Sequence, residues 1–157
     1  MRDFSWVCRN FGACKVSERA PMNRPHTLAE VARRRNTGEQ EFSEALREFL
    51  DEFYDTLRAG KAADLIGAAP EPIDDQRLHA FLGAVGEHLA RRWNLPIPAW
   101  TDDASRFLKQ PYFTTPLEGF KATLLVESPL AFRRRLIFTE AEPLRRARMP
   151  RGTPAAT

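Results

Sequence analysis

Two stretches of the chain carry large apolar residues at the spacing of a helix face. In residues 41–58 and again in residues 74–93 they recur every three or four positions, so a helix places them along one side. The pattern predicts two long amphipathic helices that pack their apolar sides into a shared core. The residues are Phe42, Ala45, Leu46, Phe49, Leu50, Phe53, Tyr54 and Leu57 in the first stretch, and Leu78, Phe81, Leu82, Val85, Leu89 and Trp93 in the second.

Residues that favour helix ends mark further boundaries in the first half. Thr27 and Glu30 have the spacing of a capping box, which predicts a short helix from Thr27 to about residue 36. Asp74 or Asp75 is expected to cap the second long helix. Between the long helices, residues 60–73 are rich in alanine, glycine and proline and predict a connector.

The second long helix has two unusual features. Gly83 and Gly86 lower its helix propensity, and they allow another helix to approach closely. Asn94 is expected to cap its C-terminal end.

Prolines divide the second half of the chain into short pieces. In order, we predict a helix capped by Thr101 and reaching Leu108, a helix over residues 116–127, a helix capped by Ser128 and running to about residue 135, an extended segment over residues 136–138, and a last short helix over residues 140–148.

Together these elements predict a mainly α fold: a small helical domain of two longer helices plus several short ones, with at most a minor extended segment near 136–138. Residues 1–26 are expected to form a poorly ordered extension, residues 27–148 a single helical domain, and residues 149–157 a mobile tail. Met22 opens the better patterned part, which suggests that it is the natural start.

Charge is segregated along the chain, although the net charge is only +3. Residues 1–35 hold eight basic and three acidic side chains, and residues 128–157 hold seven arginines and two glutamates. Residues 39–55 between them hold seven acids and one arginine. Basic ends and an acidic middle either pair with one another on folding or present charged faces to a partner.

The sequence carries no motif for catalysis, and we expect no catalytic residues, no cofactor and no metal. Cys8 and Cys14 are interpreted as reduced thiols. His79 and His88 lie nine positions apart on one helix and so point to opposite sides, which prevents them from sharing a metal. Glycine-rich phosphate loops and a Gly-x-Ser-x-Gly turn are also missing. No stretch has the length of a membrane span, and we expect a cytoplasmic protein.

Binding surfaces are then the remaining candidates. The acidic side of residues 41–55 and the aromatic second half each suit a protein partner, and the arginine run 133–135 suits a charged one. If residues 27–58 formed a helix-turn-helix, the recognition helix would carry the acids of residues 41–55. Phosphates of DNA would repel these acids, so nucleic acid is not the favoured partner. The candidate partner-binding residues are Glu41, Glu44, Glu48, Asp51, Glu52, Asp55, Trp100, Tyr112, Arg133, Arg134 and Arg135.

Over residues 27–148 the chain resembles a family of small, largely uncharacterised bacterial proteins. The stretches that carry the resemblance are Leu-Ala-Glu-Val-Ala-Arg (28–33), Ala-Leu-Arg-Glu-Phe-Leu-Asp-Glu-Phe-Tyr (45–54), Leu-Pro-Ile-Pro-Ala-Trp-Thr (95–101) and Glu-Ser-Pro-Leu-Ala-Phe-Arg-Arg-Arg (127–135). The family is often encoded beside toxin-like or nucleotidyltransferase-like genes, and related segments follow helix-turn-helix domains. This resemblance implies an antitoxin-like or regulatory role and no catalytic residues. The chain departs from the DNA-binding versions because it lacks a convincing recognition helix.

The leading hypothesis from the sequence is a non-enzymatic protein-interaction module, the antitoxin-like or regulatory partner of a bacterial toxin or enzyme. The first alternative is a DNA-binding transcriptional regulator that uses the basic C-terminal segment. The second is an enzyme whose site is assembled by the fold from distant residues.

Overall fold

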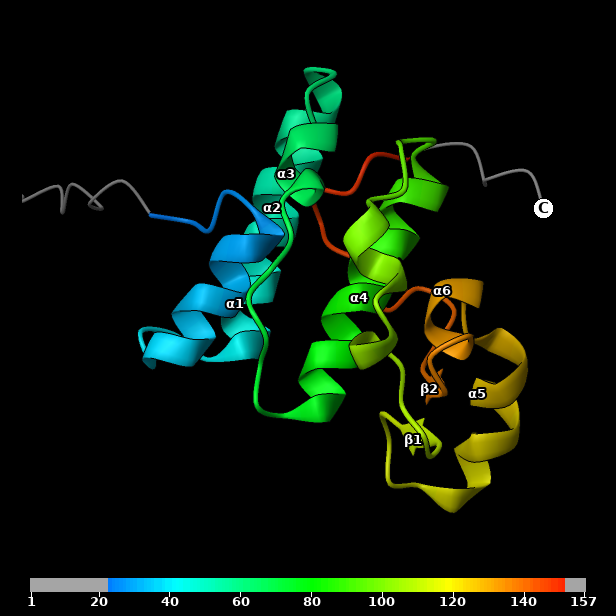
Figure 1. Ribbon diagram of the computed structural model, residues 1–157. Coiled ribbons are helices and arrows are strands. Elements are labelled where there is room, and N and C mark those ends of the chain that lie inside the picture. Colours follow the sequence, from blue (N-terminus) through cyan, green and yellow to red (C-terminus); the bar gives the residue numbers. More distant parts are fainter. Residues whose placement is uncertain (1–22, 152–157) are drawn as a thin grey trace, which may run out of the picture.

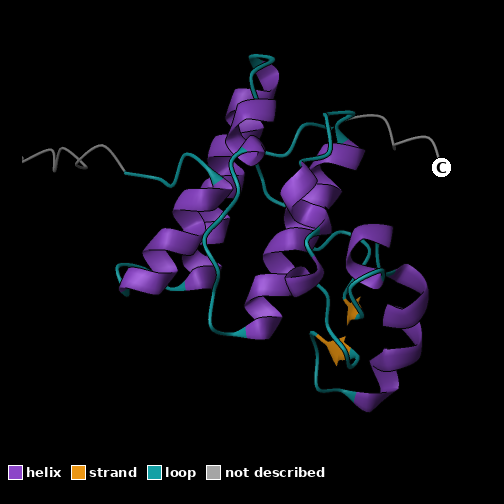
Figure 2. Cartoon of the chain, viewed as in Figure 1, coloured by secondary structure: helices purple, strands orange, loops and turns teal. Residues whose placement is uncertain are grey.

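The computed structural model describes residues 23–151, and these residues are mainly helical (Figure 2). The predicted fold class is confirmed. Most of the expected N-terminal extension and of the tail, together with Cys8, Cys14 and the proposed start at Met22, lies outside the described residues. In chain order the elements are α1 (Leu28–Thr37), α2 (Phe42–Arg58), α3 (Ala63–Gly67), α4 (Gln76–Arg92), the short 3-10 helices η1 (Ala99–Asp102) and η2 (Ala104–Arg106), β1 (Tyr112–Phe113), the 3-10 helix η3 (Glu118–Phe120), α5 (Lys121–Glu127), α6 (Leu130–Arg133) and β2 (Ile137–Phe138).

Capping side chains begin the helices largely where the sequence indicates. Thr27 Oγ1 accepts the N–H of Glu30 at 3.1 Å, as in a capping box. The carboxylate of Glu30 instead accepts the N–H of His26 at 2.8 Å, so the reciprocal half of the box is made one residue earlier. Asp75 is the cap of α4, accepting the N–H of Arg77 at 2.8 Å. Asn94 follows α4 with a φ of 53°, the left-handed conformation typical of a helix C-terminus.

Helix α4 is the centre of the described fold (Figure 1). Helices α1 and α2 pair with each other on one side, and the segment with β1, α5, α6 and β2 lies on the other. Phe42 meets Phe81 edge to face at 6.3 Å between ring centres, and Tyr54 meets Trp93 at 6.1 Å. Because the early residues of α2 contact the early part of α4 and the late residues contact its end, the two helices run in the same direction.

The glycines of α4 allow a close approach, but chiefly of side chains rather than of a helix backbone. A Cβ on Gly86 would lie 2.7 Å from the ring of Trp100, and one on Gly83 would lie 3.1 Å from Arg106 and from Arg135. These side chains come from η1, η2 and the end of α6. The glycines therefore create a second buried face on α4, opposite the face that α2 covers.

The extended segment predicted near residues 136–138 is a strand, and it has a partner. Ile137 lies beside Tyr112 and Phe138 beside Phe113 in a two-stranded parallel sheet. The chain between the strands forms η3, α5 and α6. Ser128 ties this crossover to the sheet, because its hydroxyl donates to the carbonyl of Leu124 (2.5 Å) and accepts the N–H of Thr139 (2.8 Å). Ser128 is thus not the side-chain cap of the following helix that the sequence predicts; α6 starts at Leu130 without one.

Several short elements differ from the prediction. Thr101 does not cap a helix: it lies inside η1, and Asp103 caps η2 by accepting the N–H of Ser105 at 2.8 Å. Residues 140–148 form turns instead of a helix, and the expected connector 60–73 contains α3. Met149, assigned to the tail, packs against the core. Long-range packing decides these pieces, which are too short for periodicity to define.

Candidate functional site

A buried ionic cluster joins the middle of α4 to the end of α6. Glu87 is completely buried, and its carboxylate accepts hydrogen bonds from Arg135 (2.5 Å), Arg134 (2.7 Å) and Arg91 (2.7 Å). Arg134 also reaches Asp102 at 3.2 Å. Two residues of the predicted basic run are therefore committed to an acid of the same chain.

Arg135 has no surface to offer a partner. It is completely buried, and it also donates to the carbonyls of Ala131 (2.7 Å) and Thr101 (2.6 Å). Its guanidinium lies 4.7 Å from the ring centre of Phe107, and its Nε would lie 3.1 Å from a Cβ on Gly83. The prediction that residues 133–135 form an accessible cluster was wrong for Arg135; only Arg133 is exposed and outside the ionic cluster.

The arginines control the protonation of the cluster. Burial alone would raise the pKa of Glu87, but hydrogen bonds from Arg135, Arg91 and Arg134 outweigh it and hold that pKa below its ordinary value. Burial lowers the pKa of Arg135, and the bond to Glu87 opposes this effect. Glu87 thus stays ionised at neutral pH. This fits a structural ion pair better than a proton-transfer group, whose pKa would lie near neutrality.

The acidic side of α2 is divided into a paired end and a free end. Arg146 forms two hydrogen bonds with Asp51, at 3.0 and 2.6 Å, and Arg148 bonds to Asp55. Glu52 lies 3.4 Å from His26. The basic C-terminal segment therefore neutralises the late part of this face. The acids at the start of α2, Glu41, Glu44 and Glu48, form no ion pair among residues 23–151.

Trp100 has a structural position. Its indole N–H donates to the carbonyl of Ile66 at 3.0 Å, and its ring rests on Gly86. The guanidinium of Arg106 stacks 4.7 Å from the Trp100 ring centre and donates to the carbonyl of Pro70 at 2.8 Å. Trp100 therefore fastens η1 and the α3 region to α4, and its partly buried ring leaves little for a partner to contact.

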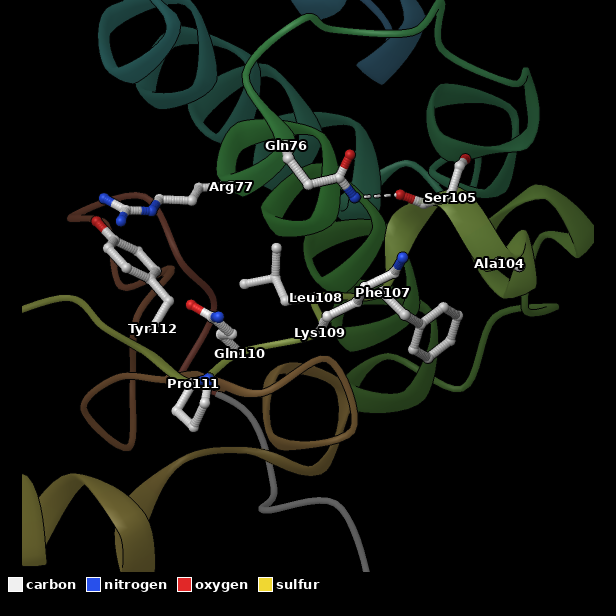
Figure 3. A pocket seen from close by; sticks show the side chains of 10 residues that line it. All are labelled: Gln76, Arg77, Ala104, Ser105, Phe107, Leu108, Lys109, Gln110, Pro111 and Tyr112. Atoms are coloured by element: carbon white, nitrogen blue, oxygen red, sulfur yellow. Dashed lines mark hydrogen bonds between the residues drawn. The ribbon is translucent and has the colours of Figure 1, made fainter.

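A cleft of about 560 Å³ opens beside the first turn of α4 (Figure 3). Gln76 and Arg77 border it on α4, and Lys109, Gln110 and Tyr112 border it on the segment that leads into β1. The lining has basic and amide side chains but no acid. Tyr112 is the only predicted candidate residue that lines this cleft. The cleft could not be predicted from the sequence, because the two segments that form its walls are more than 25 residues apart in the chain.

Ser105, at the edge of the cleft, lies near a histidine without forming an activated nucleophile. His79 Nε2 is 3.1 Å from Ser105 Oγ, while His79 Nδ1 accepts the N–H of Ile73 at 3.3 Å. With Nδ1 accepting, the neutral ring carries its proton on Nε2, which donates to Ser105. A general base needs that nitrogen free. Burial and the neighbouring Arg106 lower the pKa of His79, so the ring stays neutral.

His88 gives the fold a predictable response to acid. It lies against Phe132, at 5.7 Å between ring centres, and burial, aided by Arg92, lowers its pKa to about 4 from 6.5. In the unfolded chain, His88 becomes protonated at a higher pH than in the folded chain. The contribution of neutral His88 to the free energy of unfolding is therefore present in full above about pH 6.5 and is lost as the pH falls towards 4. We expect His88 to account for about 2 kcal/mol of lost unfolding free energy between pH 7.5 and about pH 5. Urea unfolding at both pH values, compared with His88→Gln, measures it; equal pH dependence in the two proteins would contradict this assignment.

The largest exposed apolar residues gather on the crossover between the strands. Ile97 is the one large exposed apolar residue among residues 23–151 that lies elsewhere. The five on the crossover, with their exposed fractions, are Leu117 (58%), Phe120 (56%), Leu125 (46%), Val126 (78%) and Leu130 (49%). We call this set the apolar face of residues 117–130. The aromatic second half suggests such a surface, but four of these five residues are aliphatic, and none of the five was among the predicted candidates.

Two further classes of site concern metal ions and membranes. Within residues 23–151, no three histidine, cysteine or acidic side chains come together in a way that would hold a metal ion. None of the helices in that part of the chain has the length and apolar character to cross a membrane. Compared with known proteins, the chain matches no protein-family model, no curated protein and no solved structure. The resemblance to small bacterial proteins therefore stays a prediction.

Proposed function

We propose that this chain is a non-enzymatic protein-interaction module, and that its partner protein binds the apolar face of residues 117–130. The observation that carries the proposal is the exposure of five large aliphatic and aromatic side chains within fourteen residues. Scattered single apolar residues are normal on protein surfaces, but a concentration of them in one short stretch favours a binding site.

The orientation of α5 supports this proposal. Leu124 is its only buried residue, and Val126 follows two positions later, about 200° around the helix. Ala122 and Leu125 lie on the same outward side as Val126 and are also exposed. A surface helix normally turns its polar side outward. This helix turns an apolar side outward. Exposing apolar side chains to water costs free energy, and a bound partner would remove that cost by covering them.

The chemistry of the rest of the chain is consistent with a binding role. The histidine–serine pair has the wrong tautomer for a nucleophile, and the buried carboxylate is held ionised by three arginines. Glu41, Glu44 and Glu48, which form no ion pair within residues 23–151, offer a separate acidic surface that a basic partner would contact. The antitoxin-like or regulatory form of the role rests on the resemblance to the bacterial family, and the partner would then be a neighbouring toxin or enzyme.

Partner capture with matched variants tests the proposal. The tagged chain is expressed at native level in its host, and bound proteins are identified by quantitative mass spectrometry. We expect one specific protein, with recovery reduced at least tenfold by Val126→Glu because a buried charge is costly at the centre of an apolar interface. Ile97→Glu is the matched control, since Ile97 is a comparably exposed apolar residue (43%) away from this face.

Two results would contradict this assignment. Equal recovery of the partner with Val126→Glu and with the unchanged chain would exclude the apolar face of residues 117–130 as the binding surface. Failure to recover any specific protein would count against the interaction module itself. An equal loss with Ile97→Glu would indicate a general effect of added charge.

The DNA-binding alternative receives less support. Of the seven C-terminal arginines, Arg134, Arg135, Arg146 and Arg148 pair with acids of the same chain. Phosphates would have to compete with those acids. Only the remaining three arginines lack an ion pair among the described residues, so any test of nucleic-acid binding has to use them and spare Arg135. They are Arg133, Arg145 and Arg151.

A further inference from the structure

Two neighbouring pockets share a wall made by Arg77 and Tyr112. One is the cleft of about 560 Å³ shown in Figure 3, and the other is a groove of about 310 Å³ between α2, α4 and β1. The guanidinium carbon of Arg77 lies 4.8 Å from the ring centre of Tyr112. Each volume is of the size that small molecules occupy in proteins. The shared wall makes the two pockets parts of one site with different chemistry on its two sides.

The groove is the apolar compartment. Phe42 and Leu46 line it from α2, Leu78 and Phe81 line it from α4, and the Tyr112 ring closes it. Phe42 and Phe81 meet edge to face, and both line the groove. The polar atoms at its rim come from Ser43, Arg47 and Thr114 in addition to Arg77. A hydrocarbon chain or ring would exchange contact with water for contact with these side chains.

The cations around the two pockets lack acidic partners. Arg47, Arg77 and Lys109 form no ion pair among residues 23–151, although most arginines in this part of the chain pair with an acid. Arg47 is held against its own helix by a 3.0 Å bond to the carbonyl of Ser43. No aspartate or glutamate lines either pocket. The site therefore attracts negative charge next to an apolar groove.

We propose that this site binds a small amphipathic anion, a ligand whose hydrocarbon part enters the groove and whose carboxylate or phosphate meets Arg77. Lys109, on the other side of the cleft, adds positive charge to it. Arg77 is placed to serve both parts, because it lines both pockets and its guanidinium lies over the Tyr112 ring. Gln110 supplies a further hydrogen-bond donor in the cleft, whereas the amide of Gln76 already donates to the carbonyl of Ser105 at 2.6 Å. This site is separate in its residues from the apolar face of residues 117–130, so the two proposals succeed or fail independently.

Titration calorimetry on the full protein tests the proposal. The probes separate the effect of the anionic group from that of the hydrocarbon part of the ligand. Octanoate and octyl phosphate carry both a hydrocarbon chain and an anionic group. Octanol carries only the hydrocarbon chain, and acetate carries the anionic group with almost no hydrocarbon. We expect octanoate and octyl phosphate to bind at least tenfold more tightly than octanol and acetate. The order of the first two identifies the anion that the site prefers. Broadening or shift of the Tyr112 ring signals in NMR spectra locates the bound probe.

Variants on exposed arginines complete the test. Arg77→Gln, which keeps much of the side-chain length, is expected to weaken octanoate binding about tenfold. Arg133→Gln is the matched control and should leave it unchanged, since Arg133 is also exposed and lies on α6. Equal binding of octanol and octanoate, no change at Tyr112, or no effect of Arg77→Gln would overturn the proposal. The proposal would also be overturned if the molecular mass halved during the titration, because the probe would then be displacing a second copy of the protein from the groove.

Discussion

Replacing Glu87 with alanine is expected to lower the free energy of unfolding by about 3–5 kcal/mol, the usual cost of removing one partner from a buried ion pair. Arg135 is completely buried and would lose its only acidic partner within residues 23–151. It would keep the carbonyls of Thr101 and Ala131, which satisfy hydrogen bonds but do not neutralise its charge. Urea unfolding followed by circular dichroism at neutral pH measures the loss.

Asp102→Ala is the matched control for this variant. Asp102 also binds Arg134, at 3.2 Å, but its side chain is largely exposed, so we expect a loss below about 1 kcal/mol. Similar losses for the two variants would show that the cluster is solvated and that Glu87 does not hold α6 on α4.

Replacing Phe132 with alanine is expected to cost a similar 3–5 kcal/mol, as is usual for deleting a buried phenylalanine ring. Phe132 is completely buried and meets Phe81 edge to face at 5.2 Å, which makes it the main apolar link between α6 and α4. The same change should raise the pKa of His88 towards 6.5, because it uncovers the imidazole. Urea unfolding and an NMR titration of His88 measure the two effects.

Leu130→Ala provides the comparison on the same helix. Leu130 is about half exposed, so its loss should cost less than about 1 kcal/mol and leave the pKa of His88 unchanged. A loss for Leu130→Ala as large as that for Phe132→Ala would mean that α6 packs with its other side towards α4.

The long helices were predictable because their apolar residues repeat over several turns. Helix α2 carries one continuous apolar stripe, and it forms over Phe42–Arg58, close to the predicted limits. Caps such as Asp75 and the left-handed Asn94 are local features, and a single sequence shows them. Periodicity is informative here because each helix is long enough for its pattern to exceed chance.

The second buried face of α4 is also marked in the sequence, but by small residues and not by large apolar ones. Small residues and one acid recur at helical spacing there, at Ala80, Gly83, Ala84 and Glu87, and all four are buried. A stripe of small residues indicates close packing, and an acid within it indicates a buried basic partner. Which arginine would fill that role could not be predicted, because Arg134 and Arg135 are 47 and 48 positions away.

The candidate surfaces were predicted less well, for a related reason. Charge counts indicated both acidic and basic faces, but they could not show that Asp51 and Asp55 pair with Arg146 and Arg148, more than 90 residues later. The short second-half elements depend on such distant contacts. Only the fold shows that α5 buries Leu124 and exposes the aliphatic residues beside it.

The unfolding free energy of Val126→Glu shows whether the apolar face of residues 117–130 is a surface open to a partner or part of the core. We expect an unfolding free energy within about 0.5 kcal/mol of that of the unchanged chain, because Val126 is 78% exposed and lies opposite the buried Leu124. A loss of about 2 kcal/mol or more would contradict it, since a charge has that effect only where the side chain is buried within the chain itself.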